Sequence, residues 1–324
     1  MGASRILVTG GAGFIGSHLV DALLESGREV VVLDNFVTGK RENLAAHAGN
    51  PAFTLIEGDI RDFDVCRRAV AGCAGVLHEA ALGSVPRSME DPQSTLSTNV
   101  QGFVNVIEAA RQAGVKRFVY ASSSSVYGDD PRLPKREDSV GNPLSPYAYS
   151  KRCNETTAAL YRRVFGFSSI GLRYFNVFGA RQDPGSAYAA VIPKFAAALI
   201  RHESPVIHGD GSFSRDFTYV DNVVRANLLA GDTETPEALG QVCNIACGEA
   251  TTIRELFLAL RGALSQYDPA IAGIEVRYDA ERPGDVPHSL AAIGKAERLL
   301  GYHPECRAAE GLRRAAKWYW EHLK

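Results

Sequence analysis

The sequence lacks a surplus of charge of either sign. Its 35 basic and 37 acidic side chains leave a formal net charge of −2. Proteins that bind nucleic acids normally carry a basic surplus to meet the phosphates, so the composition argues against a nucleic-acid partner. Hydrophobic residues make up 45% of the 324 residues, as in a folded globular protein and unlike a disordered one.

The chain also lacks a long apolar run, an apolar signal segment and a CxxC pair. No stretch approaches the roughly 20 apolar residues that span a bilayer, and none precedes the first strand-like run, so we expect a cytoplasmic protein without membrane contact. No Cys/His cluster has the spacing of zinc ligands, so we expect reduced thiols and no metal site. The six cysteines are Cys66, Cys73, Cys153, Cys243, Cys247 and Cys306.

Short apolar runs alternate with amphipathic stretches in the first half of the chain. These runs are rich in Val, Ile, Leu and Phe with little alternation, which is typical of strands buried on both faces of a parallel sheet. We therefore predict an α/β fold with a doubly wound parallel sheet of the Rossmann type, and two long helices at 91–114 and 146–165. The strand candidates are 5–10, 29–34, 53–59, 75–80, 117–123 and 168–174.

The alternation of strand and helix candidates becomes less regular after about residue 175. We expect a Rossmann domain over 1–175, with a returning segment near 216–245, and a smaller α/β substrate domain over most of 176–324. Its strand candidates are 205–210, 216–220, 241–247 and 274–279, and its helices lie near 190–201, 221–231, 252–264 and 308–323.

A glycine-rich turn follows the first predicted strand. Residues 9–16 read TGGAGFIG and stand between a strand and a helix. Such a turn lets the backbone approach a pyrophosphate at a helix N-terminus, which supplies N–H donors and a favourable dipole. The motif therefore predicts a dinucleotide site.

Two aspartates follow the next strands. Asp34 ends the second predicted strand, 18 residues after Gly16. A carboxylate there accepts hydrogen bonds from both adenosine ribose hydroxyls and repels a 2′-phosphate, which favours NAD over NADP. Asp59 follows the third strand and either approaches the adenine edge or caps a turn.

A tyrosine and a lysine share one face of the predicted helix 146–165. Tyr147 and Lys151 are four residues apart, and the serine run 122–125 ends the preceding strand. A free tyrosine has a pKa of about 10, and a nearby ammonium together with a positive nicotinamide favours its phenolate. The pattern predicts a tyrosine that acts as a base beside a nicotinamide cofactor.

Together these motifs resemble the extended short-chain dehydrogenase/reductase family. In the first half the resemblance rests on residues 9–16, Asp34, Asp59, 78–81 (HEAA), Asn99, the serines before 126–128 (VYG), and Tyr147 with Lys151. The second half is similar to the nucleotide-sugar 4-epimerases of that family, through 173–179 (RYFNVFG), 215–217 (RDF), 220–221 (VD) and 282–285 (RPGD).

The resemblance implies three catalytic residues and one reaction. Ser123 matches the residue that hydrogen-bonds the sugar's 4-hydroxyl, and Tyr147 matches the base that removes its proton. Lys151 matches the residue that lowers the tyrosine pKa and holds the nicotinamide ribose. The implied reaction is transient oxidation at carbon 4 by tightly held NAD, rotation of the 4-keto sugar and return of the hydride to the opposite face.

The resemblance also implies binding positions for NAD and for a UDP-sugar, in which Arg215 and Arg282 grip the diphosphate. The cofactor positions are Gly10, Gly13, Phe14, Ile15, Gly16, Asp34, Asn35, Asp59, Ile60, Ala80, Asn99, Tyr147, Lys151 and Tyr174. The substrate positions are Ser84, Ser124, Ser125, Asn176, Gln182, Ala190, Val191, Arg215, Arg282, Asp285 and Ser289.

Two features bear on the substrate. Ser124 and Ser125 stand where the dehydratases and decarboxylases of the family usually carry an acid, which favours simple epimerisation. Ser289 stands where hexose-restricted epimerases have a bulky tyrosine, which leaves room for a 2-acetamido group. We expect UDP-N-acetylglucosamine and UDP-N-acetylgalactosamine. The alternatives are UDP-glucose and UDP-galactose, then a UDP-hexuronic acid such as UDP-glucuronate, and last a non-catalytic NAD-binding regulator.

The two long predicted helices carry apolar stripes, which on the first include Val100, Phe103, Val104 and Ile107. In relatives the equivalent pair forms a four-helix bundle across a homodimer interface, so we expect a homodimer. The alternative is that these stripes only pack against the sheet.

Overall fold

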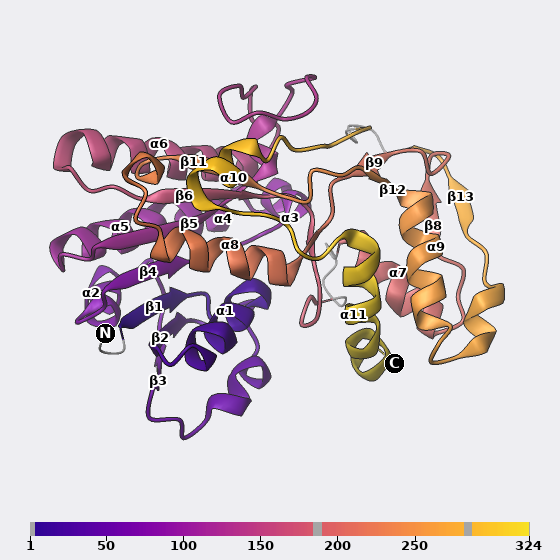
Figure 1. Ribbon diagram of the computed structural model, residues 1–324, viewed down its shortest axis with the longest axis horizontal. Coiled ribbons are helices and arrows are strands. Elements are labelled where there is room, and N and C mark those ends of the chain that lie inside the picture. Colours follow the sequence, from indigo (N-terminus) through magenta and orange to yellow (C-terminus); the bar gives the residue numbers. More distant parts are fainter. Residues whose placement is uncertain (1–3, 184–189, 282–286, 324) are drawn as a thin grey trace.

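The computed structural model describes residues 4–183, 190–281 and 287–323 (Figure 1). Within these ranges the centre of the fold is a parallel sheet of seven strands in the order β11-β6-β5-β4-β1-β2-β3. The order starts at β1 and runs outward in both directions, which confirms the predicted doubly wound arrangement. The strands are β1 (Arg5–Thr9), β2 (Glu29–Asp34), β3 (Phe53–Glu57), β4 (Gly75–His78), β5 (Arg117–Ser123), β6 (Ile170–Tyr174) and β11 (Val242–Ile245).

Side chains of the strands alternate between two hydrophobic cores, one on each face of the sheet. Val8, Val30 and Val32 enter one core, and Leu7 and Val31 enter the other. All five are at most 1% exposed, which explains why the strands read as continuous apolar runs. The first core is covered by α1 (Phe14–Glu25), α8 (Val220–Asp232) and α10 (Gly294–Leu300). The second is covered by α2 (Phe63–Val70), α5 (Gly102–Gln112) and α6 (Pro146–Phe165).

Helix α6 has the bounds that the sequence predicts. The Ser145 side chain accepts a hydrogen bond from the Ala148 N–H, and Pro146 occupies the first helical position. Gly166, in a left-handed conformation, ends the helix. These local signals fix the register of the helix that carries Tyr147 and Lys151.

The predicted helix 91–114 is wrong as a single element. The structure divides it into α4 (Pro92–Leu96), a π-helical turn (Ser97–Gln101) and α5. Short α3 (Val85–Glu90) precedes it. The π turn is fixed by tertiary bonds of Asn99 to the backbone of Leu82, which a hydrophobic pattern does not reveal.

The second part of the chain surrounds a third core with α7 (Val191–Ile200), α9 (Ile253–Leu264) and α11 (Ala308–His322). Among its described residues the strands form three two-stranded ladders, and the predicted strand 216–220 shrinks to two residues. The ladders pair β8 (Val206–His208) with β13 (Arg277–Asp279), β9 (Ser214–Arg215) with β12 (Thr251–Thr252), and β10 (Thr218–Tyr219) with β7 (Val177–Phe178).

Late segments of the chain return to the first part. Strand β11 comes from the segment near 216–245 and pairs with β6. Helix α8 packs against both strands in the first core. Helix α10 also joins the first core, through Ala296, Leu299 and Leu300. No helix in the described ranges combines the length and apolarity needed to cross a membrane.

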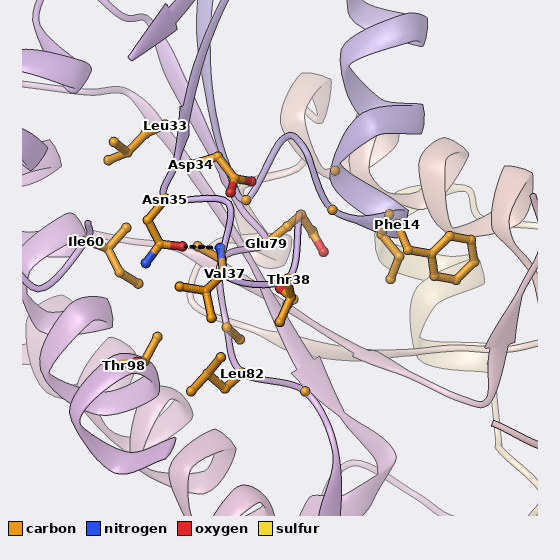
Figure 2. A pocket seen from close by; sticks show the side chains of 18 of the residues that line it. Phe14, Leu33, Asp34, Asn35, Val37, Thr38, Ile60, Glu79, Leu82 and Thr98 are labelled. Carbon is orange, nitrogen blue, oxygen red and sulfur yellow. Dashed lines mark hydrogen bonds between the residues drawn. The ribbon is translucent and has the colours of Figure 1, made fainter. Parts of the chain in front are cut away.

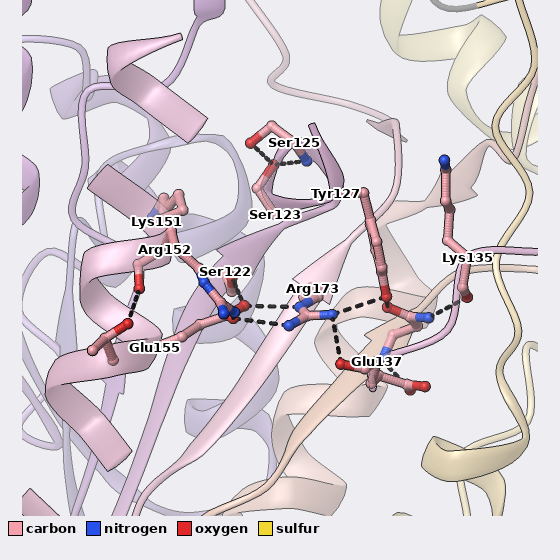
Figure 3. A network of polar contacts seen from close by, with 12 residues as sticks. Ser122, Ser123, Ser125, Tyr127, Lys135, Glu137, Lys151, Arg152, Glu155 and Arg173 are labelled. Carbon is pink, nitrogen blue, oxygen red and sulfur yellow. Dashed lines mark hydrogen bonds and ion pairs between the residues drawn. The ribbon is translucent and has the colours of Figure 1, made fainter. Parts of the chain in front are cut away.

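A buried polar network joins α6 to the sheet (Figure 3). Arg173 on β6 donates from Nε and from one terminal nitrogen to the two carboxylate oxygens of Glu155 on α6, each at 2.8 Å. Ser122 on β5 donates to the same carboxylate at 2.6 Å. Arg173 also donates to the Tyr127 hydroxyl, which in turn donates to Asn244 on β11. The network therefore ties three strands and one helix at a single point.

We expect Glu155→Gln to destabilise the fold by about 3 kcal/mol or more, because it leaves the Arg173 charge buried without its partner. The matched control is Glu108→Gln, which breaks a more exposed pair with Arg111 and should cost less than about 1 kcal/mol. Urea unfolding followed by circular dichroism measures both. Equal losses of unfolding free energy in the two variants would contradict the special importance of the buried Glu155–Arg173 pair.

Candidate active site

The glycine turn, β2 and β4 enclose a cavity of about 500 Å³, which we call the first cavity (Figure 2). It lies at the carboxyl ends of the central strands, where doubly wound sheets bind ligands. Of the predicted cofactor positions, Gly10, Gly13, Phe14, Ile15, Gly16, Asp34, Asn35, Ile60, Ala80, Tyr147, Lys151 and Tyr174 line it.

The glycine turn leaves no room for a side chain at Gly10 or Gly16. A Cβ on Gly16 would lie 2.1 Å from the Gly10 carbonyl oxygen, and Gly10 itself has a φ of +71°. Gly13 caps α1 without a side-chain hydrogen bond, so the first N–H groups of the helix face the turn. The turn fits a pyrophosphate held by backbone donors.

Asp34 closes this turn from β2. Its Oδ2 accepts from the Ala12 N–H at 2.9 Å, and its Oδ1 accepts from the Phe36 N–H at 2.8 Å. Burial raises the pKa of Asp34, while the two N–H donors oppose that effect. Each carboxylate oxygen keeps a lone pair, so the side chain can still accept from a ribose.

Asp59 and Asn99, two further predicted cofactor positions, support the wall of the first cavity rather than line it. Asp59 accepts from Arg61 and Asn35, both of which do line it, and the Arg61 hydrogen bond holds the pKa of Asp59 at about 2. Asn99 is 1% exposed and bonds both backbone groups of Leu82, which stands in the wall.

The three predicted catalytic residues come together where β5 ends. Figure 3 shows two of them, Ser123 and Lys151. The Ser123 hydroxyl lies beside the Tyr147 side chain and favours a lower pKa of that phenol. Lys151 Nζ lies 6.0 Å from the Tyr147 ring centroid and donates to the Ala121 carbonyl at 2.9 Å. Tyr147 and Lys151 line the first cavity, whereas Ser123 stands beside the phenol and is not one of the lining residues.

Burial dominates the pKa values of Tyr147 and Lys151 in the protein alone. The prediction sets both an ammonium and a positive nicotinamide beside the phenol. In the protein alone, burial raises the pKa of Tyr147 and outweighs the effect of the Ser123 hydroxyl. Burial also lowers the pKa of Lys151 to about 8, against the opposing carboxylates Glu79 and Glu155. In the protein alone the tyrosine is therefore held neutral.

A second cavity of about 560 Å³ lies in the other part of the chain. Asn176, Gln182, Ala190, Val191 and Arg215, all predicted substrate positions, line it. Asn176 has a φ of +37°, and its side-chain amide donates to the Asp216 carbonyl at 3.0 Å.

The other predicted substrate positions are elsewhere or not described. Ser84 caps α3, and Ser125 donates to the Ser123 hydroxyl at 3.0 Å. Ser124 begins the 3-10 turn Ser124–Tyr127 beside them, and the Ser289 N–H donates to the Ser214 carbonyl at 3.0 Å. Arg282 and Asp285 lie outside the described residues.

Several residues of the cavities carried no assignment from the sequence. Glu79 and Thr98 line the first cavity, and Lys194 and Arg277 line the second. Thr98 lies in the π turn, Lys194 on α7 and Arg277 on β13, and no local motif marks any of them. Glu79 stands inside the 78–81 segment that carried the resemblance.

Comparisons with known proteins agree with this geometry. A model of the "NAD dependent epimerase/dehydratase family" matches residues 6–246. The chain belongs to this family. NAD is accordingly its cofactor, and the glycine turn, the free lone pairs of Asp34 and the Tyr147–Lys151 pair fit that group. The described residues contain no group of three or more His, Cys, Asp or Glu that could hold a metal ion.

Three similar proteins show the range of the family. A putative UDP-glucose 4-epimerase of Methanocaldococcus jannaschii is 39% identical over 97% of both chains. The solved UDP-N-acetylglucosamine 4-epimerase of Methanobrevibacter ruminantium, in complex with UDP-N-acetylmuramic acid, is 39% identical over 99% of both chains, with a TM-score of 0.91. The UDP-glucuronic acid 4-epimerase of Bacillus cereus, solved with UDP-glucuronic acid and NAD, is 31% identical with a TM-score of 0.88. It covers 98% of this chain and 99% of its own.

We expect Gly16→Ala to abolish NAD retention, because the new Cβ would collide with the Gly10 carbonyl oxygen and open the turn. The nucleotide released by acid from purified protein, measured by absorbance, reports retention. Gly262→Ala on α9, where a Cβ meets no atom within 4 Å, is the matched control and should keep its NAD. Equal NAD content in the two variants would refute this role of the turn.

Proposed function

We propose that the protein interconverts the C4 epimers of a UDP-sugar, with UDP-N-acetylglucosamine and UDP-N-acetylgalactosamine as its preferred pair. The observation that carries the proposal is the Tyr147 phenol in the wall of the first cavity, with the Lys151 ammonium and the Ser123 hydroxyl beside it. Family membership and epimerase relatives that act on three kinds of UDP-sugar support the reaction class.

In the proposed mechanism Tyr147 takes the proton of the sugar's 4-hydroxyl and later returns it. Ser123 hydrogen-bonds the same hydroxyl and orients it toward the phenol. Bound NAD supplies a hydride acceptor for carbon 4 and, in its reduced form, a donor. Because burial alone keeps Tyr147 neutral, the proton moves only when positive charge beside the phenol stabilises its phenolate. Lys151 is the fixed part of that charge, and its bond to the Ala121 carbonyl holds it in place.

The second cavity is the proposed site of the nucleotide diphosphate. Lys194, Arg215 and Arg277 bring positive charge to its wall, and Phe195 and Phe217 bring aromatic surface. Cations suit a diphosphate and aromatic faces suit a base. An anchor remote from carbon 4 keeps the keto sugar from leaving while it turns. Arg282 and Asp285 remain proposed contacts from the segment that the structure does not describe.

The choice of an acetylated sugar rests on Ser289 and on the serines that follow β5. Ser289 is fixed by its backbone to Ser214, so the position is held and its side chain is small. Ser124 and Ser125 place no acid next to Ser123, which supports epimerisation without a second step. UDP-glucose and UDP-galactose are the second candidates and UDP-glucuronate the third.

We also propose a division of labour, a location and an assembly. Residues 1–175 with the segment near 216–245 bind NAD, and most of 176–324 binds the UDP-sugar. The six unpaired cysteines fit a reducing cytoplasm.

A homodimer through α5 and α6 is supported by Tyr149, Leu160 and Val164 on α6, which are 53%, 43% and 57% exposed. Of the predicted stripe on α5, Phe103 and Ile107 instead pack inside the second core.

The reaction is tested by incubating the protein, without added cofactor, with UDP-N-acetylglucosamine or UDP-glucose and following the 4-epimers by proton NMR. We expect faster turnover of the acetylated sugar. Tyr147→Phe should lower kcat by about a thousandfold or more while the protein retains NAD, because the base is lost. Tyr267→Phe, a tyrosine stacked on Trp320 outside both cavities, is the control and should keep full activity.

Ser289→Tyr tests the substrate choice in the same assay. It should lower turnover of the acetylated sugar at least about tenfold and spare UDP-glucose, because it fills the space that an acetamido group needs. Turnover of UDP-glucose alone by the natural protein would refute the preference and leave the reaction class intact.

The dimer is tested by Leu160→Glu combined with Val164→Glu, which places two charges on the exposed face of α6. Light scattering after size exclusion should show a dimer for the natural chain and a monomer for the variant. Leu258→Glu, on the exposed face of α9, is the control and should remain dimeric. A natural chain that elutes as a monomer would refute the assembly.

A further inference from the structure

Glu79 is an ionisable group in the wall of the first cavity that the mechanism above does not use (Figure 2). It directly follows β4, and its N–H donates to the Thr9 carbonyl at 3.1 Å, so the backbone is fixed to β1. Its Oε1 lies 2.7 Å from the Tyr174 hydroxyl. The side chain is therefore held at both ends.

The direction of these hydrogen bonds is determined by Asn227 on α8. Its Nδ2 donates to the Val223 carbonyl at 2.9 Å and to the Tyr174 hydroxyl oxygen at 2.8 Å. Tyr174 has one proton, which is left for Glu79 Oε1. Oε1 is thus an acceptor in either charge state, and any proton on the carboxyl must sit on Oε2. The chain Asn227–Tyr174–Glu79 orients the carboxyl without fixing its charge.

The charge of Glu79 acts on the catalytic pair. Glu79, Tyr147 and Lys151 line the same cavity, and the negative charge of Glu79 favours a higher pKa for both Lys151 and Tyr147. Two groups act on Glu79 itself, namely the Lys151 ammonium and the Tyr174 hydroxyl from β6. The negative charge of Glu155 also acts on Lys151 and favours its ammonium. His78 adds no charge near neutrality, because burial lowers its pKa to about 3. Burial raises the pKa of Glu79 to about 7.

We propose that Glu79 is a positioning residue that counterbalances Lys151 and thereby sets the pH at which Tyr147 becomes a base. Ionised, it offsets part of the ammonium and makes the phenolate less favourable. Protonated, it leaves the ammonium to act on Tyr147 unopposed. Ionisation of Glu79 therefore makes ionisation of Tyr147 harder, and activity rises with pH more gradually than it would for a single titrating group. This inference rests on the proposed role of Tyr147 as the base.

Glu79→Gln tests the inference because it keeps an acceptor for Tyr174 and removes the charge. Across roughly pH 5 to pH 9, the rising limb of the kcat profile should become steeper and move to lower pH by about one unit. Glu108→Gln, which removes the same charge from an ion pair on α5, should keep the natural profile. Glu79→Asp keeps the carboxylate and should keep the shallow rise.

A second measurement needs no substrate. The carboxyl binds its proton more tightly in the folded protein than in the unfolded chain, because its pKa rises from 4.5 to about 7. Its contribution to stability is therefore present below pH 4.5 and is lost as the pH rises toward about 7. Glu79→Gln lacks this loss, so its melting temperature should rise relative to that of the natural protein between about pH 5 and about pH 8.

The two measurements separate the possible failures. If Glu79→Gln shifts the melting temperature but leaves the pH profile of kcat unchanged, the positioning role is overturned. If the melting curves of Glu79→Gln and the natural protein are identical at every pH, Glu79 does not titrate near neutrality. If the natural protein converts no UDP-sugar, the proposed function fails, and with it the catalytic part of this inference. The melting comparison then still decides whether Glu79 titrates near neutrality.

Discussion

The buried ion pair between Arg173 and Glu155 is the constraint on which the active site depends. Glu155 lies one helical turn after Lys151 on α6, so the contact that holds the carboxylate against β6 also sets the height of the lysine above the sheet. Ser122, one residue before Ser123, bonds the same carboxylate from β5. The position of Ser123 and that of the helix carrying Tyr147, the proposed base, are thus both fixed by the Glu155 carboxylate.

This registration matters because the chemistry needs groups from different elements at fixed separations. A buried ion pair adds little net stability over an apolar contact, since desolvation offsets most of the attraction. It does penalise any sliding of the helix, because a shifted α6 would leave a charge unpaired in the core. The pair therefore serves precision rather than stability.

The sequence predicts those parts of the site in which the chemistry dictates a local spacing. The glycine turn, Asp34 and the Tyr147–Lys151 pair all depend on neighbours within one strand–turn–helix unit, and α6 carries its own caps. It cannot predict contacts made by residues distant in the chain. The carboxyl of Glu79 is oriented by Tyr174 and Asn227, which lie far from it in the chain.

Other elements escape prediction for the same reason. The π turn after α4 depends on Asn99 meeting the backbone of Leu82. The raised pKa of Tyr147 depends on burial by the whole fold, which the spacing of two residues cannot express. The strand predicted at 216–220 is shortened because its partner, β7, has only two residues to offer.

The return of β11 to the edge of the sheet has a consequence for how the protein is made. The residues paired at this edge, 170–174 with 242–245, are separated by about 70 positions, and most of the third core is encoded between them or after them. On the ribosome, β6 must wait with an unpaired edge until β11 emerges. Such non-local closure is slow, and an open edge can pair with other chains. During synthesis, this unfinished edge is where the nascent chain most needs protection.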